Sequence, residues 1–196
     1  DSDWDAIVEG IGVIGNSKLV IDDTPGISIT ELRSKCRKMK LEQGLSMIII
    51  DYLQLMSGSG GKSSESRQQE ISEISRSLKA IARELSVPVI ALSQLSRACE
   101  SRTDHRPMLS DLRESGAIEQ DADMVLFLDR PAMYGAQTID TNRYGLISSD
   151  GVGIMHVTKN REGATGRIYF RHNKSLTRIT DYDSPATDAI GEAGPF

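Results

Sequence analysis

Two polar side chains end apolar runs of the sequence, at positions that suit phosphate chemistry. Asp51 closes the run 47–51 (MIIID), and Gln94 follows the run 87–92 (VPVIAL). A carboxylate at the end of a central strand can hold Mg²⁺, usually through water, in a nucleotide site, but it can also simply begin a turn. A strand-end amide can sense a terminal phosphate, or it can cap the strand. Spacing alone leaves both interpretations of each residue open.

A long charged segment, 111–123 (DLRESGAIEQDAD), surrounds a central glycine. Arg113 can pair with a phosphate, and Gly116 allows backbone N–H groups to approach one. The alternative is a solvated start of a helix, and spacing does not choose between the two.

Two cations flank Asn160 at the start of an expected hairpin turn. Lys159 and Arg161 occupy alternate strand positions, so their side chains point the same way. On a projecting tip they could reach the phosphates of a neighbouring subunit, as an arginine finger does. The alternative is a pair of ordinary solvated charges.

The segment 58–64 (GSGGKSS) has the look of a phosphate loop but not its spacing. The pattern requires Gly, four residues and then Gly-Lys-Ser/Thr, and Met56 stands where the first glycine is needed. We therefore interpret it as a flexible loop. Because Gly-Lys-Ser/Thr occurs nowhere else, any phosphate loop that serves this chain lies outside it.

Alternating strands and helices must position these residues. Ser28, three residues before Glu31, has the spacing of a helix capping box. A second helix, with Ser66 as its expected cap, shows apolar residues at intervals of three and four: Ile71, Ile74, Leu78, Ile81 and Leu85. Strands are expected at 18–22, 47–51, 87–92 and 124–128, followed by an antiparallel hairpin at 153–159 and 167–171. The pattern predicts the α/β class, with a mainly parallel sheet flanked by helices and a C-terminal antiparallel hairpin.

The charge is unevenly spread over the 196 residues. The net charge is −5, but residues 1–17 and 181–196 carry −4 each, which leaves +3 on residues 18–180. An acidic total therefore does not exclude nucleic acid. Two cysteines 63 residues apart, Cys36 and Cys99, suit a reducing cytoplasm, and no apolar run is long enough to span a membrane.

Three long strings closely resemble the C-terminal motor domain of the bacterial replicative DNA helicase, DnaB type. They are IIIDYLQLM (48–56), the stretch 66–97 that ends in VPVIALSQLSR, and the stretch 106–130 that contains DLRESGAIEQDAD. They occur in the family's order and at similar spacing. TKNREGATG (158–166) resembles the family's finger hairpin, and residues 20–40 resemble its earlier strand and helix.

The resemblance implies a RecA-like domain that works in a hexameric ring. Such a ring uses ATP and Mg²⁺ to translocate 5′ to 3′ on single-stranded DNA. By this resemblance Asp51 would act on magnesium, through water, and Gln94 would sense the phosphate.

The resemblance also assigns two further groups of residues. The loop that grips the DNA backbone would carry Arg113, Glu114 and Gly116. A group reaching in trans to the neighbour's ATP would comprise Lys159, Asn160 and Arg161, with Arg161 as the finger. The implied partners are single-stranded DNA, further copies of the chain in a homohexamer, primase and a helicase loader. The resemblance implies a cytoplasmic protein that does not bind a membrane.

The sequence departs from the family because it lacks the phosphate loop, the catalytic glutamate and the primase-interacting domain. We therefore interpret residues 18–180 as the C-terminal two-thirds of the motor domain, residues 1–17 as the remnant of a preceding helix, and residues 181–196 as a disordered acidic tail. This stretch alone is expected not to hydrolyse ATP. The alternative is a RecA-like ring-forming binding module, such as a helicase loader or recombination mediator paralogue, without helicase activity.

Overall fold

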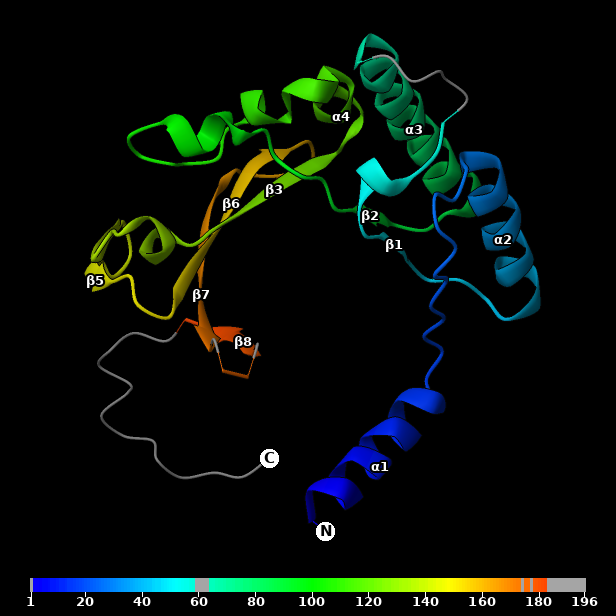
Figure 1. Cartoon of the computed structure of the whole chain (residues 1–196), viewed down its shortest axis with the longest axis horizontal. Helices are drawn as coiled ribbons and strands as arrows, with labels where there is room; N and C mark the ends of the chain where they lie inside the picture. Colours follow the sequence, from blue (N-terminus) through cyan, green and yellow to red (C-terminus); the bar gives the residue numbers. More distant parts are fainter. Residues whose placement is uncertain (1, 59–63, 174, 177, 183–196) are drawn as a thin grey trace.

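A computed structural model describes residues 2–58, 64–173, 175–176 and 178–182 (Figure 1). The side chains of residues 2, 3, 64–66 and 113–115 lie outside this description. The α-helices are α1 Ser2–Gly15, α2 Ile29–Glu42, α3 Ser64–Leu85 and α4 Gly116–Asp121. Short 3-10 helices are η1 Leu53–Leu55, η2 Arg97–Ser101, η3 Leu109–Ser115 and η4 Pro131–Tyr134. The strands are β1 Ile48–Ile50, β2 Val89–Ala91, β3 Met124–Asp129, β4 Thr138–Thr141, β5 Gly145–Ser148, β6 Val152–Asn160, β7 Gly166–Asn173 and β8 Arg178–Asp181.

The first part of the fold is a parallel pair of short strands under two helices. β1 and β2 pair with Ile48 opposite Val89 and Ile50 opposite Ala91. The apolar stripe of α3 faces them, and its predicted members are all nearly inaccessible to solvent, with Ile81 fully buried. Because residues at intervals of three and four share one helix face, four members of this stripe form one core with the strands: Ile74, Leu78, Ile81 and Leu85.

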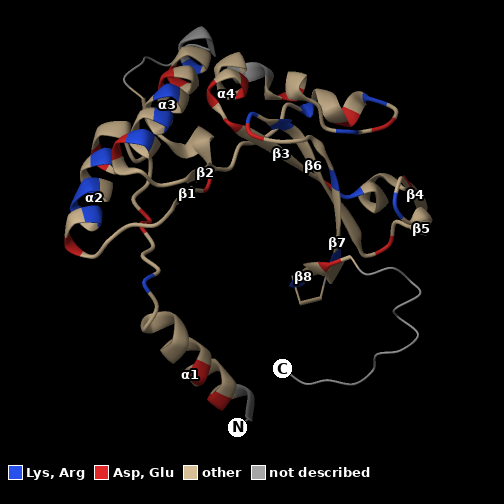
Figure 2. Cartoon of the chain, turned by 180° about the vertical axis from the view of Figure 1, so that it is seen from behind, with Lys and Arg blue, Asp and Glu red and all other residues tan. Residues whose placement is uncertain are grey.

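The helix α2 begins where its capping signal predicts. The Ser28 hydroxyl accepts a hydrogen bond from the Glu31 backbone N–H at 3.2 Å. Glu84 of α3 pairs with Arg33 at 3.4 Å and with Arg37, which lowers the pKa of the Glu84 carboxyl. Figure 2 marks further Lys and Arg positions in blue along α2 and α3. By contrast, α3 begins at Ser64, so Ser66 lies inside the helix and not at its cap.

The second part of the fold is an antiparallel sheet in the order β3-β6-β7-β8. β6 and β7 form the predicted hairpin, and β6 also pairs with β3, so its two edges are both occupied. The β4–β5 hairpin, which the sequence patterns did not indicate, packs through Ile139 and Ile147 against Val152 and Ile154. Tyr182, assigned above to the tail, is buried in the same cluster. The remainder of that expected tail, 183–196, and residues 59–63 of the expected loop lie outside the described residues.

The mixed α/β arrangement agrees with the expected fold class. However, a smaller share of the described strands pair in parallel than the sequence predicts. Among the described strands, only β1 and β2 pair in parallel, apart from an isolated parallel bridge between Ser28 and Ser57, and the antiparallel part is larger than the expected hairpin. The expected strand at 18–22 is wrong: it is an unpaired connector between α1 and α2, and Ile21 is 80% exposed. A strand requires a neighbour for its backbone hydrogen bonds, and no described strand pairs with this segment.

One face of the strands and the helix α1 remain exposed. Continuous apolar runs such as those of β1 and β3 are typical of strands covered on both faces, yet Ile49 is 63% and Leu128 64% exposed, while Ile50 and Phe127 are buried. Alternate strand residues point to opposite faces, and the described helices cover one of them. α1 stands apart from the other elements in both views (Figures 1 and 2). No described helix is both long and apolar enough to cross a lipid bilayer.

Candidate functional site

The loops after β1 and β2 meet at one edge of the parallel pair. Leu92 N donates to the Ile50 carbonyl and Leu53 N donates to the Leu92 carbonyl, both at 2.9 Å. The Gln54 side chain then joins the two loops. Its Nε2 donates to the Ser93 hydroxyl at 3.1 Å, and its Oε1 accepts from the Gln94 backbone N–H at 3.3 Å. Asp51 and Gln94 therefore follow adjacent strand ends held by one amide.

Asp51 is exposed and directly follows β1. Among the described residues, its carboxylate has neither a hydrogen bond nor an ion pair, and no group of three or more metal-binding side chains is present. A single free carboxylate suits Mg²⁺ that keeps most of its water and takes other ligands from substrate phosphates. The exposed carboxylate of Asp51 could hold such a metal, and this role stays a prediction.

The tip of the β6–β7 hairpin rests on the carboxyl end of α4. Lys159 Nζ donates to the carbonyls of Glu119 and Gln120, the latter at 3.4 Å. A cation is favourable there because helix carbonyls accumulate negative partial charge at this end. Asn160 closes the turn: its Nδ2 donates to the Ala164 carbonyl at 3.3 Å, and its Oδ1 accepts from Glu162 N at 3.2 Å.

Arg161 contacts its own chain through the α4–β3 connection. Its guanidinium donates to the Gln120 carbonyl and lies 3.5 Å from Asp123 Oδ1, while its side chain stays 44% exposed. Asp123 also pairs with Lys79 of α3, which is the main cause of its lowered carboxyl pKa. Asp123 therefore joins the hairpin tip to α3.

The DNA-loop candidates lie in η3 and at the start of α4. The side chains of Arg113 and Glu114 are outside the described residues, but the backbone of both belongs to η3. Gly116 is exposed, and a Cβ placed on it would have no neighbour within 4 Å. Packing therefore does not require glycine here, and the position leaves room for an approaching ligand.

A buried ion pair braces this loop. Asp111 is 3% exposed and binds Arg102 through both oxygens, with Nη1 to Oδ1 at 2.8 Å. Asp111 Oδ2 also accepts from Met108 N at 2.7 Å. The Arg102 guanidinium is the main cause of the lowered pKa of the Asp111 carboxyl.

A backbone hydrogen bond connects the two loops. Ser96 N, two residues after Gln94, donates to the Asp111 carbonyl at 3.0 Å, two residues before Arg113. Leu95 packs beside Leu112 in the same small core. The segment that follows β2 is thus joined directly to η3.

The structure therefore places the predicted residues in three groups, of which the loop group Arg113, Glu114 and Gly116 is described above. Asp51 and Gln94 share one strand edge, whereas Lys159, Asn160 and Arg161 lie beside α4, and no described hydrogen bond or ion pair joins these two groups. Sequence reasoning missed three residues that hold them: Gln54, Asp111 and Asp123. Gln54 could have been noticed in the sequence, because it is a polar residue between two leucines. Asp123 carried none, because its partner Lys79 is 44 residues away.

Known proteins of one family are similar to this chain in sequence. The family model of the DnaB-like helicase C terminal domain matches residues 1–181. The chain is 49% identical over 189 residues to the replicative DNA helicase DnaC of Bacillus subtilis, covering 96% of this chain and 39% of that protein. It is also 49% identical over 181 residues to the replicative DNA helicase DnaB of Geobacillus stearothermophilus, covering 92% of this chain and 38% of the relative.

Two solved structures share the fold. One, described as an ATPase domain, superposes with a TM-score of 0.82 at 39% identity, covering 93% of this chain and 61% of that one. A DnaB-like replicative helicase, described with its interactions with primase, superposes with a TM-score of 0.80 at 39% identity, covering 93% of this chain and 42% of that one.

The fold is thus that of a RecA-like helicase ATPase domain. The chain belongs to the DnaB-like helicase C-terminal domain family, as its sequence resemblance predicts. It spans about two fifths of the length of the curated relatives, since it covers 39% and 38% of the two named above.

Proposed function

We propose that this chain is part of the motor of a hexameric replicative DNA helicase that couples ATP hydrolysis to 5′–3′ translocation on single-stranded DNA and to duplex unwinding. The observation that carries the proposal is the placement of Asp51 and Gln94 on adjacent strand ends joined by Gln54, in a chain of this family. The whole helicase would act in the cytoplasm. A ring-forming binding module is less favoured, because the relatives named above are helicases.

At the nucleotide, Asp51 would hold magnesium through water, and Gln94 would contact the terminal phosphate. A phosphate loop from another part of the protein would complete the site, so the present stretch alone would not turn over ATP. When bound, Mg²⁺ would neutralise charge on the phosphates. Because Ser96 joins the Gln94 segment to η3, a shift of Gln94 would be transmitted to the loop that carries Arg113, Glu114 and Gly116.

Lys159, Asn160 and Arg161 would serve the neighbouring subunit's ATP, with Arg161 as the finger. Arg161 would exchange the Gln120 carbonyl and Asp123 for phosphate oxygens. This exchange costs little, because an exposed ion pair contributes only about 0–1 kcal/mol. A phosphate can accept two hydrogen bonds from one guanidinium, which strengthens the new contact.

DNA would be gripped through its phosphates, since the candidate loop 111–123 contains no aromatic side chain for base stacking. One solved neighbour is described with primase, and we extend this partner, together with a helicase loader, to the whole protein.

The finger is tested in a chimera in which residues 1–181 replace the matching segment of the Bacillus subtilis helicase. Arg161→Ala should abolish ATPase activity while ATP binding persists. The matched control is Asp123→Ala, which removes the same contact within the chain but keeps the guanidinium, and it should retain activity. Equal loss in both variants would show that only the local structure matters.

Action in trans is tested by mixing two inactive chimeras, Asp51→Asn and Arg161→Ala. A mixed ring contains interfaces that combine an intact Asp51 with the finger of the other subunit, so activity should return. A mixture that stays inactive, although mass measurements show mixed rings, would refute the finger assignment.

The DNA loop is tested by single-strand binding of the same chimera. Arg113→Ala should weaken binding of several single-stranded sequences about equally, because a phosphate contact does not depend on the base. A sequence-selective loss would contradict backbone gripping.

A further inference from the structure

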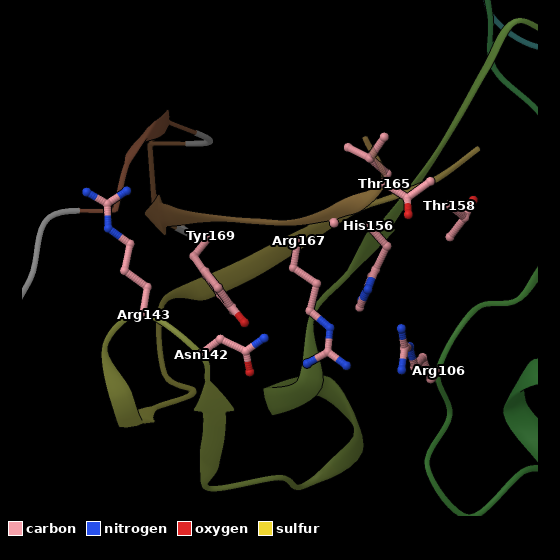
Figure 3. Close-up of a pocket in the computed structure, with 10 residues that line it drawn as sticks. Arg106, Asn142, Arg143, His156, Thr158, Thr165, Arg167 and Tyr169 are labelled. Carbon is pink, nitrogen blue, oxygen red and sulfur yellow. The ribbon is translucent and has the colours of Figure 1, made fainter. Parts of the chain in front are cut away.

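A basic pocket lies apart from the residues assigned above. Its volume is about 490 Å³, and it opens between the β6–β7 hairpin, the turn of the β4–β5 hairpin and the loop before η3. Figure 3 shows the side chains of Arg106, His156 and Arg167 directed toward one space, with Asn142 beside it, whereas the guanidinium of Arg143 points away from this space. A volume of this size accommodates a small molecule.

The pocket carries an excess of positive charge. Three of its lining residues are arginines, Arg106, Arg143 and Arg167, and none is an aspartate or glutamate. None of the three pairs with a carboxylate among the described residues, although Arg143 lies 5.3 Å from the centre of the Tyr144 ring. Guanidinium groups left without anions around a concavity suit an oxyanion that accepts several hydrogen bonds.

A buried histidine adds a polar group to the pocket lining. His156 is 2% exposed, and its Nε2 lies 3.3 Å from Asp129 Oδ2. Its other nitrogen, Nδ1, is buried without a hydrogen-bond partner among the described residues. A buried polar atom that lacks a partner is costly, and a ligand that supplies one removes this cost.

We propose that this pocket binds the oligophosphate of a nucleotide, as a second anion site distinct from the proposed ATP site. The charges favour this ligand over a nucleic-acid backbone. The unpaired guanidinium groups of Arg106 and Arg167 face one small space, which suits adjacent phosphates that concentrate negative charge, whereas a nucleic-acid backbone spreads one charge over each nucleotide. Thr158, Thr165 and Asn142 supply neutral hydrogen-bonding groups at the same surface.

The pocket shares no residue with the nucleotide and DNA assignments. Its floor is formed by β6 and β7, whereas Asp51 and Gln94 follow β1 and β2, and Lys159 and Arg161 contact α4. Its occupancy can therefore be measured independently of helicase activity.

The test is isothermal titration calorimetry of the 196-residue chain with pyrophosphate and with ADP, in magnesium-free buffer. Both should bind, and Arg106→Gln and Arg167→Gln should each weaken binding by about ten-fold or more, because each removes a charge-assisted contact. Both arginines are exposed, so these variants should fold, which circular dichroism verifies. The matched control is Arg178→Gln on β8, an exposed arginine outside the pocket, and it should leave binding unchanged.

Tighter binding of ADP than of pyrophosphate would show that the nucleoside is also held, and equal binding would show that the phosphates suffice; both support the site. ADP binding that is lost in Asp51→Asn but kept in both pocket variants would place the ligand elsewhere and overturn the proposal. So would absence of pyrophosphate binding, or an oligothymidylate without terminal phosphates binding in a manner that depends on Arg106 and Arg167.

Discussion

Replacement of Asp111 by asparagine should destabilise the chain and loosen the loop before α4. The carboxylate is almost fully buried and accepts three hydrogen bonds, two from Arg102 and one from Met108 N. Asparagine keeps one acceptor but turns an NH₂ group toward a donor, and it removes the opposite charge. Because breaking a buried, hydrogen-bonded ion pair costs several kcal/mol, we expect a loss of about 2–4 kcal/mol in the free energy of unfolding.

The assay is urea unfolding followed by far-ultraviolet circular dichroism. With a slope of about 2 kcal/mol per molar urea, the midpoint should fall by about 1–2 M. Asp104→Asn is the matched control, since Asp104 lies 4.0 Å from the same Arg102 but is 66% exposed. It should change stability by less than about 0.5 kcal/mol.

The pH dependence provides a second criterion. The folded-state pKa of Asp111 is lowered, so its stabilising contribution is fully present above the ordinary value of about 3.9 and is lost as pH falls through the folded value. The stability difference between the native chain and Asp111→Asn should therefore be constant from about pH 7 to 5 and should shrink below about pH 4. Equal effects of Asp104→Asn and Asp111→Asn, or a difference that grows in acid, would refute the reasoning.

Three further variants probe the core, the strand edge and the hairpin. Ile81→Ala should cost about 2–5 kcal/mol in urea unfolding, because it leaves a cavity in the α3 core, while exposed Ile49→Ala should cost far less. In the chimera, Gln54→Leu should lower ATPase activity by about ten-fold while leaving the urea midpoint nearly unchanged, since it releases the link at Gln94; unchanged activity would contradict that role. Gly153→Val should lower the thermal midpoint through a loss of about 1–3 kcal/mol, because even a Cβ would lie 2.2 Å from the Phe170 ring, and an unchanged midpoint would show that the ring yields freely.

Local patterns predicted the elements whose signals lie within one segment. The periodicity of the α3 stripe and the spacing of Ser28 and Glu31 depend on neighbours a few residues away, and both are confirmed. The strand expected at 18–22 failed for the opposite reason. Its apolar composition suits a strand, but a strand forms only where another strand offers backbone partners.

The candidate site likewise contains residues that local patterns identified and contacts that they did not. Strand-end positions identified Asp51 and Gln94 as candidates, and the structure places them at one edge because parallel strands bring their carboxyl ends together. The contacts that hold the site, such as Asp123 with Lys79 or Arg102 with buried Asp111, join segments without any shared periodicity. The basic pocket was also invisible in the sequence, since its arginines come from three separate elements and gather only in the fold.

The position of β6 in its sheet affects how the hairpin tip can move. β6 exchanges backbone hydrogen bonds with β3 on one edge and β7 on the other, and the tip begins where the β3 pairing ends, at Asn160. β6 is paired on both edges from Ile154 to Val157, and beyond Val157 only β3 continues the pairing to Asn160, so the base of the hairpin resists bending more than its tip does. Arg161 can reorient its own side chain, but a larger displacement of its backbone would carry β3, β6 and β7 with it. In the proposed ring, the orientation of each whole subunit would then determine in large part where the tip points.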